Sequence, residues 1–460
     1  MTPAFADPDA TSLPLHVVAV DALESWLSTQ GAAHRAWLTA TGFSAKLGEV
    51  QVLPGAAGVA GAVVGYGTAK ARRQTRFGLA RAALTLPGGN WHLVGNLDPA
   101  ARDEAALGWL LAQYKFDRYR KPKETPKAML KAPDGLDVIR ILAMADGEYL
   151  TRNLINTPAS DLGPTELETA FMALADQFGA ATQVIRGDDL LEQNFPMIHA
   201  VGRASPRAPR ILSMRWGTGG PSLTLVGKGV CFDTGGLDLK PSAGMLLMKK
   251  DMGGAATVMG LAQMIMALHL PIRLRVIVAA VENSVSGNAM RPRDILQSRK
   301  GLTVEVNNTD AEGRLILGDA LAWAAEENPE VLISMATLTG AARVAVGPDI
   351  APYFTDDAGL AAALEGAAGA ACDPVWRLPF WDAYEPMIEP GIADLDNAPS
   401  GGFAGAITAA LFLRRFADHP RYMHFDIFGH SPSAEPGRPK GGAGQGARAI
   451  LGALPAMLGF

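Results

Sequence analysis

The sequence predicts an α/β protein of two domains, the larger of them built on a central mixed, mostly parallel sheet flanked by helices. Helical and strand patterns alternate through most of the chain beyond residue 140, at the spacing of βα units. The strand segments are apolar along their length, which indicates burial on both faces of a sheet. The chain has 460 residues, whereas an average domain has roughly 150, so more than one domain is expected.

The first domain is expected over residues 1–130 as a smaller α/β unit. Its elements, in chain order, are a strand, a short helix, two short apolar stretches and a helix: 15–20, 22–28, 61–67, 78–85 and 103–116. The last helix has the clearest pattern, because Leu107, Leu110 and Leu111 fall on one face.

A basic segment at residues 118–131 follows, in which Arg and Lys alternate with Pro122 and Pro126. Basic residues mixed with prolines are typical of an exposed connector, and we expect the domains to meet here. Contact with nucleic acid is the less favoured alternative, since the chain as a whole has a net charge of -5 and gives no electrostatic footprint for nucleic acid.

The second domain is expected over residues 131–460. Helices are predicted at 143–155, 164–178, 254–268, 313–326 and 405–417. Strands are predicted at 210–215, 222–227, 273–282, 302–306, 331–337 and 422–427.

Several classes of protein are disfavoured by composition. The first basic residue is Arg35, so the positive region of a secretory signal is missing, and no apolar run approaches the ~18 residues of a membrane span. Cys231 and Cys372 are the only cysteines, too few for a disulfide framework or a thiolate zinc site. A cytoplasmic protein is the simplest expectation.

The first chemical motif is glycine-rich and follows the apolar segment Leu223–Val226. It carries Lys228 and Asp233, which we expect at the carboxyl end of that strand, where ligands bind in open α/β sheets. The alternative is a tight turn with a surface lysine and aspartate. A phosphate loop is a poor fit, because the pattern Gly-x-x-x-x-Gly-Lys-Ser/Thr is absent.

Two further motifs add Lys240 and Asp251, then Asp310 and Glu312. Asp251 precedes a helix of small residues, so capping of that helix is an equally good interpretation of this residue alone. Asp310 and Glu312 lie where a strand gives way to a helix, and they could simply complement the helix dipole.

These four acids have few side-chain bases near them in segments that are otherwise apolar. Ionised carboxylates in a dry interior are costly unless paired or bound to metal, so a cation from outside is expected. No His-Glu-x-x-His is present, which excludes the ordinary helical zinc site. Several acids suit two divalent ions, with Mg²⁺, Mn²⁺ and Zn²⁺ as candidates, in a hydrolase.

At these residues the chain resembles the leucyl aminopeptidase (cytosol aminopeptidase) family of dinuclear metallo-exopeptidases. The octapeptide Asn308–Leu315 resembles that family's signature, and the spacing of Lys228, Asp233, Lys240 and Asp251 also matches. With the Asn156-Thr-Pro158 tract, the similarity extends over roughly residues 145–460. The resemblance implies a macro-like N-terminal domain, peptide substrates with a free N-terminus, and a homohexamer.

It also implies a role for each matching residue. The expected ligands of two Zn²⁺ or Mn²⁺ ions are Lys228, Asp233, Asp251, Asp310 and Glu312. Lys240 would stabilise the oxyanion of the scissile bond, and Arg314 would hold a bicarbonate that acts as general base. The pocket for the first substrate side chain would include Met248, Thr337, Gly340 and Phe428.

Phe428 departs from the family pattern, in which a small residue stands at this position. It could reshape the side-chain pocket, or it could reflect altered core packing, and the preferred first residue is open. Two alternative functions also remain: a dipeptidase on the same metals, and a DNA-binding role of the kind found in some relatives.

Overall fold

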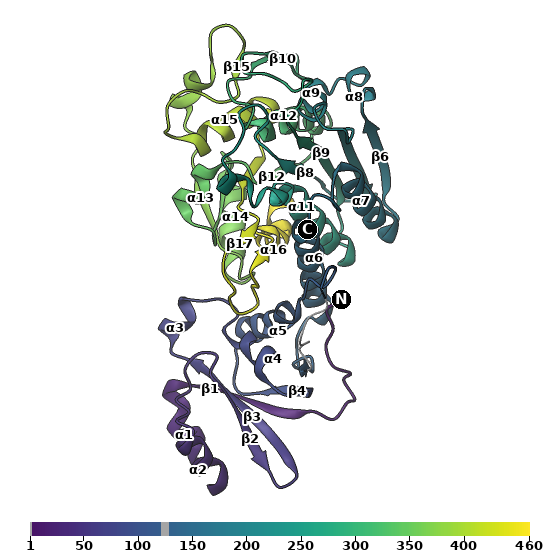
Figure 1. Ribbon diagram of the computed structural model, residues 1–460. Coiled ribbons are helices and arrows are strands. Elements are labelled where there is room, and N and C mark those ends of the chain that lie inside the picture. The colour runs from purple at the N-terminus through teal and green to yellow at the C-terminus, as the bar shows by residue number, and fades with distance from the viewer. Residues whose placement is uncertain (1, 121–127) are drawn as a thin grey trace. The chain divides into compact units, whose positions relative to one another are not determined.

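The computed structural model describes residues 2–120 and 128–460 and divides them into two compact units. The first unit extends to Tyr149 and includes Ser433–Lys440, and the second contains Leu150–Pro432 and Gly441–Phe460. The division falls within helix α6, and the sequence-based limits of 1–130 and 131–460 stay a prediction of domain organisation. Figure 1 labels the elements of both units.

The first unit contains a five-stranded sheet in the order β2-β3-β1-β4-β5. Only β2, at one edge, is antiparallel to its neighbour. The strands are β1 (Leu13–Ala19), β2 (Val50–Gly55), β3 (Gly58–Gly67), β4 (Gly89–Val94) and β5 (Ala128–Leu130). The helices are α1 (Leu23–Ser28), α2 (Ala32–Ala40), α3 (Ala69–Arg73), α4 (Arg81–Thr85) and α5 (Pro99–Gln113).

Two expectations for this unit are corrected by its structure. Helix α5 begins four residues before the predicted 103, because Asp98 accepts a hydrogen bond from Ala101 N at 2.8 Å and Pro99 follows in the first turn. The expected connector 118–131 is not exposed at its end, where Ala128 and Leu130 are buried and β5 pairs with β4. Residues 121–127 of that connector lie outside the described residues.

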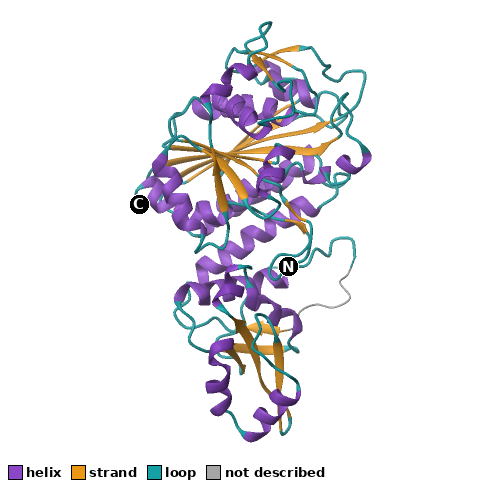
Figure 2. Cartoon of the chain, turned by 90° about the vertical axis from the view of Figure 1, so that its left-hand side faces the viewer, coloured by secondary structure: helices purple, strands orange, loops and turns teal. Residues whose placement is uncertain are grey.

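The second unit is built on an eight-stranded mixed sheet in the order β14-β13-β16-β12-β8-β9-β7-β6. Its central strands β16, β12, β8 and β9 run parallel, and Figure 2 shows helices on both faces. The strands of this sheet are β6 (Ala181–Arg186), β7 (Arg210–Trp216), β8 (Ser222–Asp233), β9 (Arg273–Asn283), β12 (Val331–Ala336), β13 (Ala351–Phe354), β14 (Val375–Leu378) and β16 (Tyr422–Asp426). Smaller sheets are formed by β10 (Ile295–Gln297), β11 (Thr303–Glu305) and β15 (Leu395–Asp396), and by β17 (His430–Ser431) and β18 (Gly441–Gly442).

Helices α9, α12 and α15 share one apolar core with strands β8, β9 and β12. Helix α11 packs tightly against β8 at Gly227, where an added Cβ would lie 2.6 Å from Ala255 Cα, so a glycine is needed there. The helices are α6 (Val138–Asn156), α7 (Pro164–Phe178), α8 (Asp189–Glu192), α9 (Pro196–Gly202), α10 (Ser242–Met245), α11 (Gly253–Ala267), α12 (Glu312–Ala325), α13 (Gly340–Val346), α14 (Ala358–Ala368), α15 (Gly405–Ala417) and α16 (Ala447–Leu458).

Most predicted elements of the second unit are confirmed, and 164–178 and 405–417 match α7 and α15 at both ends. The strand predicted at 222–227 is too short, because β8 continues to Asp233 alongside β9, and Val230 and Cys231 are buried. Lys228 and Asp233 therefore lie on a strand and not in a loop after it. None of the helices within the described ranges has the length and apolarity that crossing a membrane requires.

Candidate active site

The structure brings the charged residues of the three motifs into one cluster. Lys228 and Asp233 come from β8, Asp251 follows the short 3-10 turn Met248–Lys250, and Glu312 is the first residue of α12. Ligand oxygens of Asp233, Asp310 and Glu312 all lie within 4.8 Å of one another. Segments separated by up to about 80 residues along the chain thus converge on one site.

Each of two lysines bridges a pair of these acids. Lys228 Nζ lies 2.7 Å from Asp251 Oδ2 and 2.9 Å from Glu312 Oε1, and it donates to Thr337 O at 2.9 Å. Lys240 Nζ lies 2.7 Å from Asp233 Oδ2 and also contacts Asp310 Oδ1. Four carboxylates therefore surround two ammonium groups, which leaves negative charge in excess.

Further hydrogen bonds orient the acids. Asn283 Nδ2 donates to Asp233 Oδ1 at 2.9 Å and to Thr309 O at 3.0 Å, so it ties β8 to the segment that carries Asp310. Thr337 Oγ1 donates to Asp251 Oδ1 at 2.8 Å.

Capping of α11 is the wrong interpretation of Asp251, whereas Glu312 lies in the first turn of α12, where an acid complements the helix dipole. The N-cap of α11 is Met252 and that of α12 is Ala311, and neither cap has a side-chain hydrogen bond. The carboxylates of Asp251 and Glu312 contact Lys228 instead. Gly313 leaves room for this arrangement, because an added Cβ there would lie 2.7 Å from Lys228 Nζ.

The electrostatics of the cluster reflect this crowding of acids. Burial and the charge of Asp233 raise the pKa of Glu312 to about 8, and the same two causes raise the pKa of Asp310 to about 6. Burial opposes the charge of Lys228, but the acids Asp251, Glu312 and Asp233 outweigh it and raise its pKa above the ordinary value. An additional cation would relieve the repulsion among these carboxylates.

The donor set fits a divalent metal ion. Asp251 Oδ2, Asp310 Oδ1 and Glu312 Oε1 are buried and make no hydrogen bond within the described part of the chain, although each lies beside a lysine. Carboxylate oxygens suit Mg²⁺ and Mn²⁺, and Zn²⁺ also accepts them.

The cluster opens into a pocket of about 370 Å³, a size typical of small-molecule sites. Its lining includes all the residues expected to contact the first substrate side chain: Met248, Thr337, Gly340 and Phe428. Lys240 also lines it, whereas Glu312 and Arg314 are not among its lining residues. Phe428 is only partly buried, so it faces the pocket and is not simply a change in core packing.

Arg314 lies in the first turn of α12, two residues after Glu312, and is only 8% exposed. Among the described residues its guanidinium has no hydrogen bond and no carboxylate oxygen within 4.0 Å. Burial lowers its pKa to about 10. A buried cation in this state is suited to binding a small anion.

Sequence reasoning missed several residues that support the site. Asp426, at the end of β16, accepts hydrogen bonds from Leu338 N at 3.0 Å, Thr339 N at 2.9 Å and Thr339 Oγ1 at 2.6 Å, and so holds the segment after Thr337. Asn283 was also missed, as were Lys250 and Arg343, which line the pocket. The double lysine before Asp251 was a visible signal for Lys250, but no local pattern marks the others.

A mixed α/β sheet with clustered acids beside a pocket is typical of a metal-dependent hydrolase. A model of the catalytic domain of the cytosol aminopeptidase family matches residues 149–451, and a model of the M17 aminopeptidase N-terminal domain matches residues 13–133. The chain therefore belongs to the cytosol aminopeptidase family.

Individual relatives agree with this assignment. The chain is 36% identical over 415 residues to a probable cytosol aminopeptidase of Chlorobium luteolum, which covers 84% of this chain and 81% of the relative. The crystal structure of cytosol aminopeptidase from Coxiella burnetii is 41% identical and covers 98% of each chain with a TM-score of 0.93. The bottromycin maturation enzyme BotP in complex with Mn is 31% identical, covers 97% of this chain and 99% of BotP, and has a TM-score of 0.87.

Proposed function

We propose that the chain is a metal-dependent aminopeptidase that hydrolyses the N-terminal peptide bond of peptides. One observation carries this proposal: the oxygens of Asp233, Asp310 and Glu312 lie within 4.8 Å of one another beside a pocket of about 370 Å³, in a chain of the cytosol aminopeptidase family. The names of the curated relatives, which are probable cytosol aminopeptidases, support the same activity.

Two divalent ions would occupy the cluster, held by Lys228, Asp233, Asp251, Asp310 and Glu312. Manganese is supported by the Mn bound to BotP, and zinc suits the same donors. When bound, the ions would supply the Lewis acidity that brings the pKa of a water close to neutrality. Lys228 must release its proton to serve as a ligand, so metal binding is expected to displace protons.

The other roles fall to groups of this chain. Lys240, kept charged by Asp233 and Asp310, would stabilise the negative charge that develops on the carbonyl oxygen of the scissile bond. Arg314, which lacks a carboxylate partner among the described residues, would hold a bicarbonate that takes a proton from the attacking water. The water oxygen bonds to the carbonyl carbon, the carbon–nitrogen bond breaks, and the proton passes to the leaving amine.

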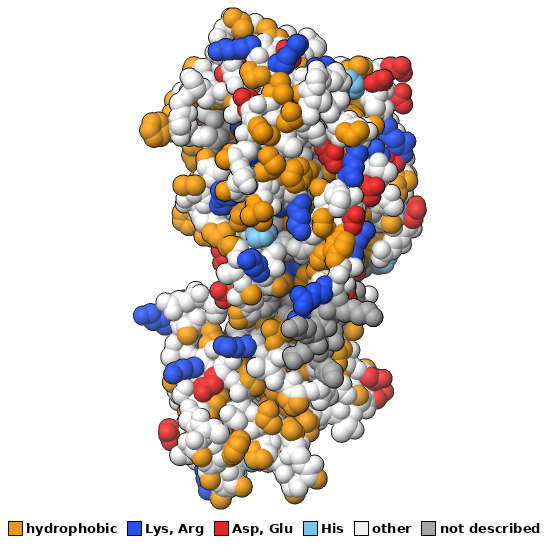
Figure 3. Space-filling view, viewed as in Figure 1, with side chains coloured by type: hydrophobic (Ala, Val, Ile, Leu, Met, Phe, Trp, Pro, Cys, Tyr) orange, Lys and Arg blue, Asp and Glu red, His pale blue; other side chains and the backbone are white. Residues whose placement is uncertain are grey.

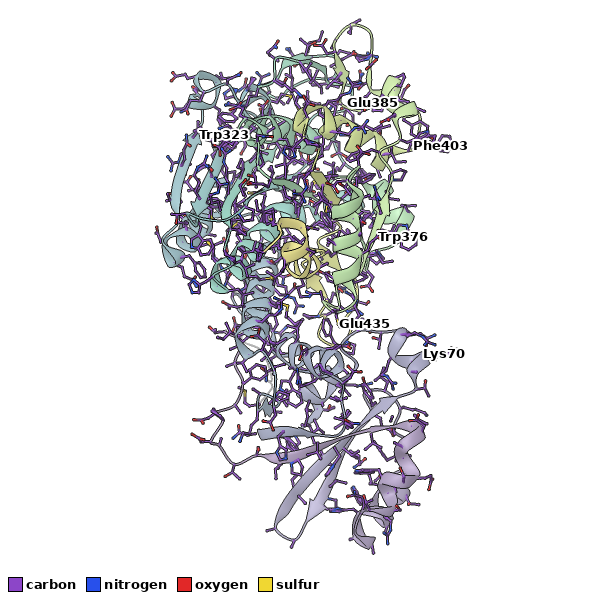
Figure 4. The ribbon with its side chains drawn as sticks, turned by 180° about the vertical axis from the view of Figure 1, so that it is seen from behind. Lys70, Trp323, Trp376, Glu385, Phe403 and Glu435 are labelled. Carbon is purple, nitrogen blue, oxygen red and sulfur yellow. The ribbon has the colours of Figure 1, made fainter. Side chains whose placement is uncertain are left out.

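The family also supports proposals about assembly and location. A cytoplasmic homohexamer is expected by resemblance, with a first domain at 1–130 and a catalytic domain at 131–460. Two aromatic side chains of the second unit are largely exposed, Phe403 at 87% and Trp376 at 61%. Both project from the surface in Figure 4.

The two alternative functions are not favoured. Lys and Arg side chains are interspersed with Asp and Glu on the face drawn in Figure 3, so that face offers no continuous basic surface for DNA among the described residues. A dipeptidase would prefer dipeptides to aminoacyl anilides, so a panel that contains both kinds of substrate separates this alternative from an aminopeptidase.

The test is an aminoacyl-anilide and dipeptide panel on metal-stripped protein, supplied again with Zn²⁺, Mn²⁺ or Mg²⁺. We expect that stripping abolishes hydrolysis of leucine anilide, that Mn²⁺ or Zn²⁺ restores it, and that elemental analysis finds two ions per chain. Full activity of protein proven free of metal would refute the proposal.

A further inference from the structure

Two cations lie over a single aromatic ring in the pocket. Lys250 Nζ is 5.2 Å, and Arg343 Cζ is 4.9 Å, from the centroid of the Phe428 ring. All three residues line the pocket. The ring attracts each cation, but it does not neutralise either charge.

Neither cation has a carboxylate in close contact among the residues that the structure describes. The Lys250 side chain is only 8% exposed, and its ammonium makes no hydrogen bond within the described ranges. Its nearest carboxylate oxygen, on Asp251, is 4.0 Å away, and Asp251 already contacts Lys228 and Thr337. A buried ammonium whose ion pair is long and shared with other groups is costly, so this one is suited to a negatively charged ligand group.

Arg343 differs from Lys250 in being exposed to solvent. Its guanidinium has neither a hydrogen bond nor an ion pair among the described residues. The acids that line the pocket are Asp233, Asp251 and Asp310, all of which belong to the proposed metal site. The part of the pocket around Phe428 is therefore positive, while the metal cluster is negative.

The chain fixes this positive region beside the expected first-side-chain contacts. Lys250 follows Met248 by two residues, and Arg343 lies one turn after Gly340 on α13. The Phe428 segment is held by Gln445 Oε1, which accepts hydrogen bonds from Phe428 N and Gly429 N, both at 2.9 Å. The cations therefore lie where the side chain of the substrate's first residue would enter.

We propose that Lys250 and Arg343 are specificity-determining residues that select an acidic N-terminal residue, aspartate or glutamate, through its side-chain carboxylate. This inference rests on the proposed aminopeptidase function and deepens it. Glutamine differs from glutamate mainly in charge, so the comparison of the two isolates the contribution of these cations.

The test compares kcat/KM for the 4-nitroanilides of glutamate, glutamine and leucine with the metal-loaded enzyme. These substrates carry no carboxylate beyond the scissile bond, so a preference for glutamate reports the first-side-chain site alone. We expect glutamate to exceed glutamine by at least roughly tenfold, because a hydrogen bond to a charged group is worth that much or more. The preference for the glutamate substrate should appear mainly as a lower KM. Free glutamate should likewise be a tighter competitive inhibitor than free glutamine.

Two variants locate the effect. Lys250→Met should lower the glutamate-to-glutamine ratio by roughly tenfold, and the exposed Arg343→Gln by a smaller factor of about three. Arg291→Gln is the matched control: its side chain is 71% exposed and is not among the pocket residues, so it removes one positive charge and should leave the ratio unchanged.

The outcomes separate the two proposals. If leucine anilide is hydrolysed while glutamine anilide is cleaved as well as glutamate anilide, the specificity proposal is overturned and the aminopeptidase function stands. An unchanged ratio in both pocket variants also overturns it. No turnover of any anilide would overturn both proposals.

Discussion

Asp426 allows a quantitative test of how the pocket is held together. Its carboxylate accepts three hydrogen bonds from the segment Leu338–Thr339, at 3.0, 2.9 and 2.6 Å. Thr339 Oγ1 in turn caps α13 by accepting from Ala342 N at 3.0 Å. Residue Thr337, directly before this segment, provides the carbonyl that binds Lys228. Loss of Asp426 should therefore loosen both the pocket wall and the carbonyl that accepts from Lys228 in the charged cluster.

The magnitude depends on the substitution. Asp426→Ala leaves two backbone N–H groups and a hydroxyl without their acceptor, and we expect a loss of about 3–5 kcal/mol in unfolding free energy. Asp426→Asn keeps a carbonyl oxygen for both N–H groups. It also removes a buried carboxylate, whose pKa burial raises to about 6. The expected loss of unfolding free energy is therefore only about 1 kcal/mol.

Urea unfolding of the metal-free variants at neutral pH would measure the difference, and amide hydrogen exchange of Gly340–Val346 would show whether α13 loosens. KM for leucine anilide should rise more in Asp426→Ala than in Asp426→Asn. If the two variants agree within about 0.5 kcal/mol, or if α13 exchanges at the wild-type rate in the alanine variant, the account of Asp426 is incorrect.

Three further predictions concern the ligands and the core. Asp310→Asn and Glu312→Gln should each lower turnover by more than the roughly 100-fold typical of a change to a residue that only supports a metal ligand. Circular dichroism should show that both variants keep the fold. Near-normal rates, or an equal loss in the exposed control Asp188→Asn, would refute the roles of Asp310 and Glu312. His424 is neutral in the fold, because burial and then the charge of Arg314 lower its pKa to about 3. The unfolded chain therefore binds more protons than the folded chain between pH 3 and about 6.5. The difference in unfolding free energy between wild type and His424→Phe should then move against wild type as the pH falls through that range. A difference that stays constant with pH would contradict this expectation. The Asp319 carboxylate accepts hydrogen bonds from Met197 N at 2.8 Å, Ile198 N at 3.3 Å and Arg299 N at 2.8 Å. Asp319→Ala should therefore lower the unfolding free energy, measured in urea, by about 3–5 kcal/mol. The exposed control Glu326→Ala should lower it by less than about 1 kcal/mol.

The acidic cluster could be expected from the sequence because its residues stand in short motifs with unusual chemistry. These motifs place acids among glycines at the ends of apolar segments. If the chain brings such acids together in its interior, a bound cation is expected, because buried carboxylates are costly without one. Helix ends were predictable for a similar local reason. Pro164 opens α7, and Gly179, with a positive φ of 66°, closes it.

Other features depend on contacts between distant segments. Asn283 meets Asp233 across 50 residues of sequence, and Asp426 meets Thr339 across 87. The extension of β8 to Asp233 likewise depends on pairing with β9. A pattern within one window cannot report such a partner, since only the fold brings it near.

The amino-acid sequence is therefore sufficient to indicate an α/β architecture, a cluster of acids that calls for divalent metal, and the family to which the chain belongs. These conclusions follow from local periodicity and from the cost of burying charge, which each motif carries with it. The electrostatic character of the pocket is different, because Lys250, Arg343 and Phe428 lie on separate segments. Their convergence is a property of the packed sheet and its loops, and it is visible only in three dimensions.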